Sequence, residues 1–205
     1  MTPLLDAQGQ AYPLNRDNCD TDTIFPAEHM KTISRVGLGQ FAFETLRQEP
    51  KSAFNDVARR DAPFLVVGSN FGCGSSREHA VWAIADIGIR VILGKGFADI
   101  FAQNAAQNGI ATIVLAPGLI DALAIRAEAY EPFAMSLADM VVTTASGERL
   151  PFELDADVRQ RLMSGVDQIE QTLSHLSEIT ARGDAVSRSP EWEVSIDTRN
   201  LNIAT

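Results

Sequence analysis

Three apolar runs, each followed by a segment with helical periodicity, limit what this chain can fold into. The first run, Phe64–Val67, is uncharged and ends at Gly68, which is typical of a strand buried on both faces. A helix is predicted at about Ser76–Ile87, because its alanines and isoleucines recur at helical spacing before Gly88. The pattern repeats as strands at Arg90–Leu93 and Ala111–Leu115 and helices at Phe97–Asn108 and Leu119–Ala129. This alternation predicts an α/β domain with parallel strands and helices packed against them.

The segment before this core is less regular. We expect one or two short strands within residues 1–14, around Tyr12–Leu14, a short helix near Ala27–Lys31 and one or two helical turns at Phe41–Arg47. Asp, Thr, Pro and Gly are frequent between residues 15 and 40, so most of that stretch is predicted to be loop.

The segment after the core predicts a hairpin and two helices. The turn at residues 145–148 separates two short strand-like runs, Met140–Thr144 and Leu150–Phe152. Helices are expected at Ala156–Met163 and Gln168–Ala181, the second opened by a D-x-x-E variant of the capping box at residues 167–170. Residues 1–182 should therefore form one domain, with residues 183–205 as a polar C-terminal tail.

Charge and cysteine content restrict the partners. The 17 basic and 27 acidic residues leave a net charge of −10, which argues against nucleic acid or an anionic membrane as a partner. Two cysteines, Cys19 and Cys73, form neither a CxxC pair nor a disulfide framework, so we expect a cytoplasmic protein. We identify no signal peptide and no apolar run long enough to span a membrane.

The most unusual segment is NFGCGSSREHA at residues 70–80, which lies between a predicted strand and a predicted helix. Free N–H groups and the helix dipole make such a junction a site for anions, and Gly72 and Gly74 allow a tight bend. Ser75 and Glu78 predict a capping box at the helix start. Arg77 would then lie in the first turn, where a cation is unfavourable by up to about 1 kcal/mol. A bound carboxylate would compensate for that charge.

Two other interpretations of this segment remain open from local physics. In the first, the segment is a capped loop with a surface arginine and binds no ligand. A dinucleotide-binding fingerprint fits less well, because Gly72 and Gly74 supply two of its glycines but Arg77 stands where the third should be.

At this segment the chain resembles a known family. GCGSSREHA resembles the swivelling domain of the aconitase superfamily, in the form found in the small subunits of isopropylmalate dehydratases. Three further segments agree, at residues 17–30, 96–104 and 162–173. The resemblance implies a single swivelling domain of three β/β/α layers. It also implies a hydro-lyase of leucine biosynthesis that isomerises isopropylmalate by dehydration and rehydration.

The resemblance also implies a partner and the role of each site residue. A large subunit would carry a [4Fe–4S] cluster on three cysteines, and this chain, with no cofactor of its own, would cap the hydroxy-dicarboxylate substrate. Two cysteines cannot supply a three-cysteine site, which agrees with that division. Ser75 would act as the alkoxide base, with Ser76 and Arg77 as substrate contacts.

Two loop residues are weaker candidates for the substrate site. Asp22 matches the family's loop aspartate near the active site, although it would equally serve as a turn cap. Arg35 lies in the KTISRVGLG segment, which in this family reaches over the substrate, although a solvated loop charge is an equal alternative.

The remaining histidines and cysteines are predicted to be structural. His29 and His79 have no partner at metal-ligand spacing, and Cys19 and Cys73 lack the His or Asn context of a nucleophile. We predict no metal site on this chain.

The chain also departs from the family pattern. Val81 stands where proline is more usual and Gly96 where serine is more usual. Citraconate, dimethylmalate and homoaconitate therefore remain possible substrates of a related dehydratase. The alternative from another class is a non-catalytic module that binds an anion or a nucleotide.

Overall fold

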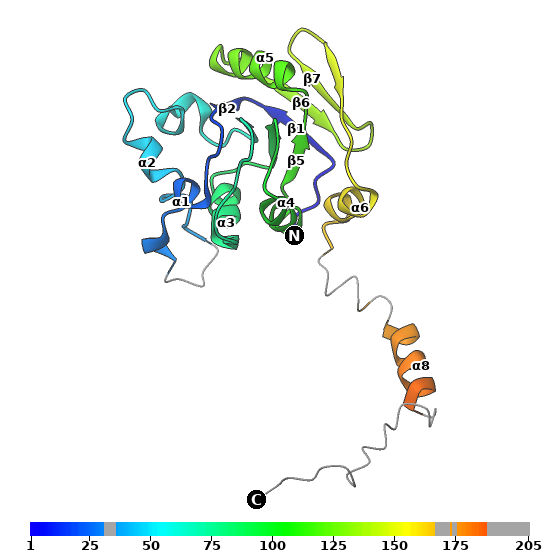
Figure 1. Cartoon of the computed structure of the whole chain (residues 1–205). Coiled ribbons are helices and arrows are strands. Elements are labelled where there is room, and N and C mark those ends of the chain that lie inside the picture. Colours follow the sequence, from blue (N-terminus) through cyan, green and yellow to red (C-terminus); the bar gives the residue numbers. More distant parts are fainter. Residues whose placement is uncertain (31–35, 167–172, 174–175, 188–205) are drawn as a thin grey trace, which may run out of the picture. The chain divides into compact units, whose positions relative to one another are not determined.

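The computed structural model describes residues 1–30, 36–166, 173 and 176–187 (Figure 1). The chain forms two compact units, Met1–Asp167 and Gln168–Thr205. In the second unit, helix α8 spans Leu176–Ser187 and so runs past the predicted helix end at Ala181. The predicted boundary between domain and tail falls inside this helix, and the D-x-x-E box lies outside the described residues. No helix in the described ranges is long and apolar enough to cross a membrane.

A parallel sheet forms the centre of the first unit. Its strands are β2 (Ala11–Leu14), β3 (Phe64–Val67), β4 (Val91–Gly94) and β5 (Ala111–Val114), in that order across the sheet. Every residue of β3 and β4 is buried, as expected for uncharged central strands. The parallel arrangement predicted from the sequence is confirmed.

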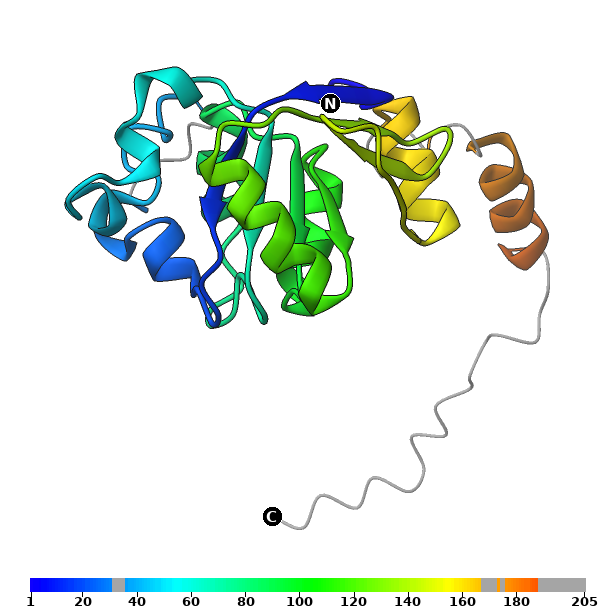
Figure 2. The same ribbon diagram turned by 90° about the horizontal axis from the view of Figure 1, so that it is seen from above.

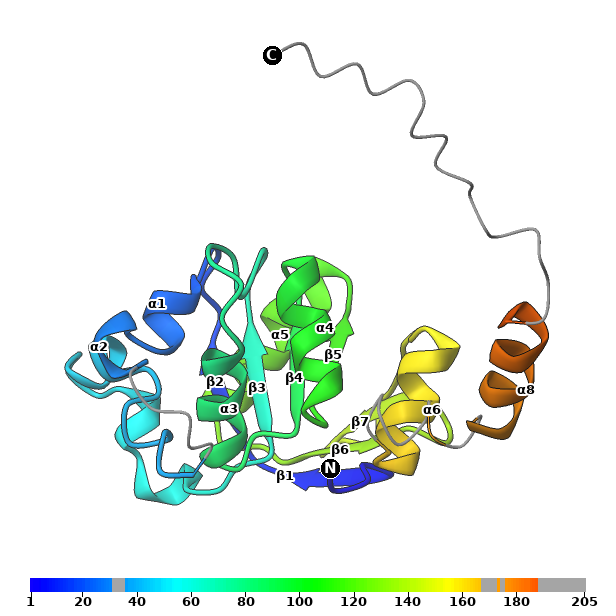
Figure 3. The ribbon, with the colours of Figure 1, turned by 90° about the horizontal axis from the view of Figure 1, so that it is seen from below.

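Three helices cover this sheet: α3 (Glu78–Asp86), α4 (Asp99–Gln107) and α5 (Pro117–Glu128). Because side chains alternate across a strand, Leu65 and Val67 belong to one core cluster with α3 and α4, whereas Phe64 and Val66 belong to another with α5. Helices α3 and α4 therefore lie on one face of the sheet and α5 on the other (Figure 3).

A second sheet completes the unit and contains the predicted hairpin. Its antiparallel strands are β1 (Asp6–Gly9), β6 (Phe133–Ser136), β7 (Val141–Thr144) and β8 (Arg149–Pro151), in that order. This sheet shares a core with α5 and with α6 (Ala156–Ser164), whose first turn is capped by Asp155. Helix α6, drawn in yellow, lies beside the strands of this sheet (Figure 2). Two sheets with helices confirm the mixed α/β class.

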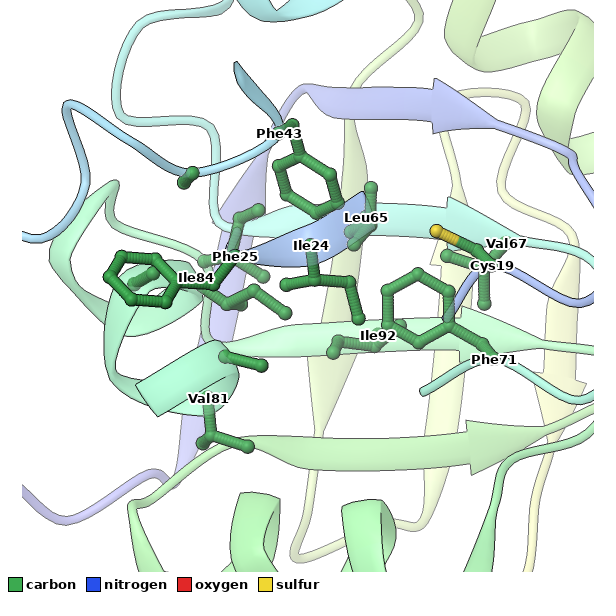
Figure 4. Packing of buried hydrophobic residues seen from close by; sticks show 14 of the residues in the cluster. Cys19, Ile24, Phe25, Phe43, Leu65, Val67, Phe71, Val81, Ile84 and Ile92 are labelled. Carbon is green, nitrogen blue, oxygen red and sulfur yellow. The ribbon is translucent and has the colours of Figure 1, made fainter. Parts of the chain in front are cut away.

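The segment before β3 folds into short helical pieces. They are α1 (Thr21–Ile24), η1 (Ala27–His29), α2 (Glu44–Arg47), η2 (Ala53–Asn55) and η3 (Val57–Arg59). Ile24, Phe25 and Phe43 bury their side chains against the same core as Leu65 and Ile92 (Figure 4). This packing fixes α1 beside the loop that follows β3.

Val81 lies in the same core. It is fully buried in α3 and belongs to the cluster that includes Ile84 (Figure 4). A valine at this position keeps the backbone N–H that a proline would remove.

Candidate active site

The loop between β3 and α3 is held by backbone hydrogen bonds on two sides. The N–H of Gly72 donates to the carbonyl of Cys19 (2.8 Å), and the N–H of Thr21 donates to the carbonyl of Cys73 (2.9 Å). On the other side, the N–H of Phe71 donates to the carbonyl of Gly96 (3.1 Å). Segments far apart in the sequence thus hold the loop in one conformation.

The two glycines of the loop have left-handed backbones, with φ of +76° at Gly72 and +93° at Gly74. At Gly72 space is also limiting, since an added Cβ would lie 2.2 Å from Cγ of Phe101. The loop therefore passes directly over the first turn of α4. Only glycine combines that φ with so close an approach.

The predicted helix start is wrong. Helix α3 begins at Glu78 rather than Ser76, and Arg77 is its N-cap residue, with an extended backbone (φ −118°, ψ 105°) and no side-chain capping bond. Ser75 lies too early to act as the cap, and its carbonyl accepts a hydrogen bond from Oγ1 of Thr21 (3.1 Å). The Ser75–Glu78 capping box is therefore not formed. The N–H groups of the first turn consequently face the loop without a serine cap.

Arg77 forms an ion pair with Asp22 of α1. Its Nη1 group donates to Oδ1 of Asp22, and the two side chains are 18% and 55% exposed. A carboxylate of this chain therefore already compensates Arg77, a role that the sequence analysis gave to a bound carboxylate. Hydrogen bonds from the side chain and backbone of Thr23 hold the pKa of neighbouring Asp20 below its ordinary value, and Arg77 contributes to the same shift.

A cavity of about 230 Å³ lies between the loop and α4. From the loop side it is lined by Thr21, Gly72, Gly74, Ser75, Ser76 and Arg77, and from the α4 side by Ala98, Asp99, Ile100, Phe101 and Asn104. Its volume is below the roughly 300 Å³ at which pockets for drug-sized ligands begin, so it suits a small molecule. Hydroxyl groups, the N-cap residue Arg77 and the first turn of α4 line it, and these features can bind an anion; Asp99 is the one acidic residue among the described residues of the lining.

The structure thus brings together four of the five site residues named from the sequence. Ser75, Ser76 and Arg77 line the same cavity, and Asp22 contacts Arg77. Arg35 lies outside the described residues.

His29 lies in a cluster that the sequence analysis missed. Its Nε2 atom is 2.8 Å from Oε2 of Glu44, and its ring stacks on Phe41 at 3.8 Å. The ligand atoms of Glu28, His29 and Glu44 lie within 4.8 Å of one another, a donor set that could hold a metal ion. Glu44 is distant from His29 in the sequence, so spacing gave no signal for this grouping.

Cys19 is buried in the core, whereas His79 is half-buried in the first turn of α3. The ring of His79 stacks on Phe25 at a centroid distance of 6.1 Å. Burial raises the pKa of the Cys19 thiol to about 12, so this thiol is not a nucleophile near neutral pH. Cys73 is a free, partly exposed cysteine.

Comparison with known proteins agrees with this geometry. A family model described as the aconitase C-terminal domain matches residues 1–118. The chain is 45% identical over 174 residues to a 3-isopropylmalate dehydratase small subunit of Erythrobacter litoralis, covering 85% of this chain and 86% of the relative. It is 42% identical over 187 residues to the protein of the same name in Novosphingobium aromaticivorans, covering 91% and 89%.

A solved structure supports the same fold. The crystal structure of 3-isopropylmalate dehydratase (leuD) from Methanocaldococcus jannaschii superposes with a TM-score of 0.64 at 23% sequence identity. The superposition covers 87% of this chain and 99% of that one.

Proposed function

The chain belongs to the aconitase C-terminal domain family and, within it, to the 3-isopropylmalate dehydratase small subunits. From this membership we propose that it is the small subunit of a two-subunit hydro-lyase. The proposed substrate is isopropylmalate, isomerised by dehydration and rehydration in leucine biosynthesis. The observation that carries the proposal is that Ser75, Ser76 and Arg77 line one small cavity at the start of α3.

Arg77 is the proposed ligand of a substrate carboxylate. A guanidinium has five N–H donors in a planar fork, and the ion pair with Asp22 involves Nη1. The remaining donors suit a two-point contact with a carboxylate. In this proposal Asp22 holds the guanidinium in place, and the start of α3 adds the positive end of a helix dipole.

Ser75 is the proposed base that removes a proton from the carbon next to a substrate carboxylate. A free serine hydroxyl is far too weakly acidic for this role, so its alkoxide needs stabilisation. Arg77 lines the same cavity, and so does the first turn of α4, whose uncapped N–H groups would add positive charge. Closure by a partner would remove water and strengthen these interactions. Ser76 would contact the substrate beside it.

The iron–sulfur cluster is proposed to lie on the large subunit. Three cysteines are needed to hold it, whereas this chain has two, and one of these is a buried thiol with a raised pKa. The residues of this chain therefore do not fit the cluster, and their proposed part is to bind and deprotonate the substrate. A cytoplasmic location and the absence of nucleic-acid and membrane partners complete the proposal, in line with the net charge of −10.

Reconstitution tests this proposal. The chain is mixed anaerobically with the large subunit bearing its cluster, and formation of the unsaturated intermediate is followed by ultraviolet absorbance. We expect turnover of isopropylmalate by the pair and none by either subunit alone. If the pair prefers citraconate, dimethylmalate or homoaconitate in the same assay, that compound and not isopropylmalate is the substrate. Absence of turnover of all four would favour a non-catalytic anion-binding module.

A further inference from the structure

Asn108, the C-cap residue of α4, forms hydrogen bonds with two residues of α3. Its Nδ2 donates to Oε1 of Glu78 (2.9 Å), and its Oδ1 accepts from Nε1 of Trp82 (3.1 Å). The same Nδ2 also donates to the carbonyl of Asn104 (2.9 Å). Because an indole N–H can only donate, Trp82 determines which end of the Asn108 amide faces Glu78.

Glu78 carries a negative charge next to the proposed anion ligand Arg77. It is the first residue of α3 and follows Arg77 directly. A carboxylate at a helix N-terminus is attracted to the free N–H groups of the first turn. It would also be attracted to an adjacent guanidinium. Left unrestrained, Glu78 would therefore compete with a bound carboxylate for the same positive groups.

We propose that Asn108 is a positioning residue that holds the Glu78 carboxylate against the end of α4, away from the guanidinium of Arg77 that lines the anion site. This inference rests on the proposed function, since the anion is taken to be the substrate carboxylate. It also explains why the S-x-x-E sequence forms no capping box. The glutamate that would complete the box is bonded to a residue thirty positions further along the chain.

Substitutions of Asn108, alone and combined with Glu78→Gln, test the inference in the reconstituted complex. Asn108→Ala frees Glu78, and we expect KM to rise about tenfold, equivalent to about 1.4 kcal/mol, with a smaller change in kcat. Asn108→Asp has nearly the same size but repels Glu78, so its KM should rise at least as much. In the Glu78→Gln background the competing charge is gone, and Asn108→Ala should then change KM less than about twofold, a ratio equivalent to about 0.4 kcal/mol. Gln107→Ala, at the neighbouring exposed position of α4, is the matched control and should leave KM unchanged.

The outcomes separate charge restraint from packing. Equal rises in KM with and without the Glu78→Gln change would overturn the inference, as would an Asn108→Asp complex closer to wild type than Asn108→Ala. A second readout does not depend on turnover: malate is titrated into the isolated chain, and the amide NMR shifts of the first turn of α3 are followed. We expect weaker malate binding in Asn108→Ala, and unchanged binding would overturn the inference even if the wild-type complex proved inactive on isopropylmalate. Lack of wild-type turnover alone would count against the proposed function only.

Discussion

Replacing Gly72 by alanine should destabilise the isolated chain strongly, for two reasons that the structure separates. The left-handed backbone, at φ +76°, costs a residue with a Cβ about 1–2 kcal/mol. The new Cβ would also lie 2.2, 2.5 and 2.6 Å from atoms of Phe101, which is buried in the core. Overpacking of this kind costs about 1–3 kcal/mol, so the total expected loss is about 2–5 kcal/mol.

Gly74 provides the matched control in the same loop. Its φ of +93° is also positive, but an added Cβ would meet its nearest atoms only at 3.6 Å, on Thr21, and 3.7 Å, on Asp20. Gly74→Ala should therefore lose only the backbone contribution, about 1–2 kcal/mol.

Urea unfolding followed by far-ultraviolet circular dichroism measures both losses. Gly72→Ala should have the lower midpoint, and the difference should shrink when Phe101 is replaced by alanine in both variants. Equal losses for Gly72→Ala and Gly74→Ala, or a difference that is unaffected by Phe101→Ala, would refute the packing contribution.

Three further predictions concern the site and its cysteines. Arg77→Lys in the complex should raise KM by an amount equivalent to about 2–3 kcal/mol, since lysine keeps the charge but loses the planar fork, and an unchanged kcat/KM would remove Arg77 as a substrate ligand. The purified chain alone should contain no iron or sulfide by chemical analysis; a stoichiometric amount of either would contradict the division between subunits. Burial raises the pKa of the Cys19 thiol to about 12, so this thiol stays protonated in the folded chain near neutral pH. At about pH 8, mass spectrometry should find iodoacetamide on Cys73 and not on Cys19 of the folded chain.

The parallel core could be predicted from the sequence because its signals are local. Phe64–Val67 is a continuous apolar run, and the helices after it repeat their apolar residues at helical spacing. The second sheet could be predicted only in part. The β7–β8 hairpin has a local turn, whereas β1 pairs with β6, so that Asp6 lies opposite Ser136. Nothing in either short segment indicates that partner.

The candidate site could also be predicted only in part from the sequence. That residues 70–77 form a loop between a strand and a helix could be predicted from glycines, serines and an arginine before a helical segment. The helix start could not, because the local S-x-x-E signal is overridden by contacts of Ser75 with Thr21 and of Glu78 with Asn108. The family resemblance named both Asp22 and Arg77, but only the fold brings them into contact.

The proposed base is tested most directly by single-turnover dehydration in the reconstituted complex, comparing Ser75→Ala with Ser76→Ala. Both serines are exposed in the same loop and line the same cavity, and neither caps α3, so both variants should keep the wild-type circular dichroism spectrum. Removal of a general base costs about 10²–10⁴ in rate. We predict a loss in this range for Ser75→Ala, with substrate still bound through Arg77, and a smaller loss for Ser76→Ala. A Ser75→Ala complex within about tenfold of wild type, short of the general-base range, or a larger loss for Ser76→Ala, would contradict the assignment of Ser75 as the base.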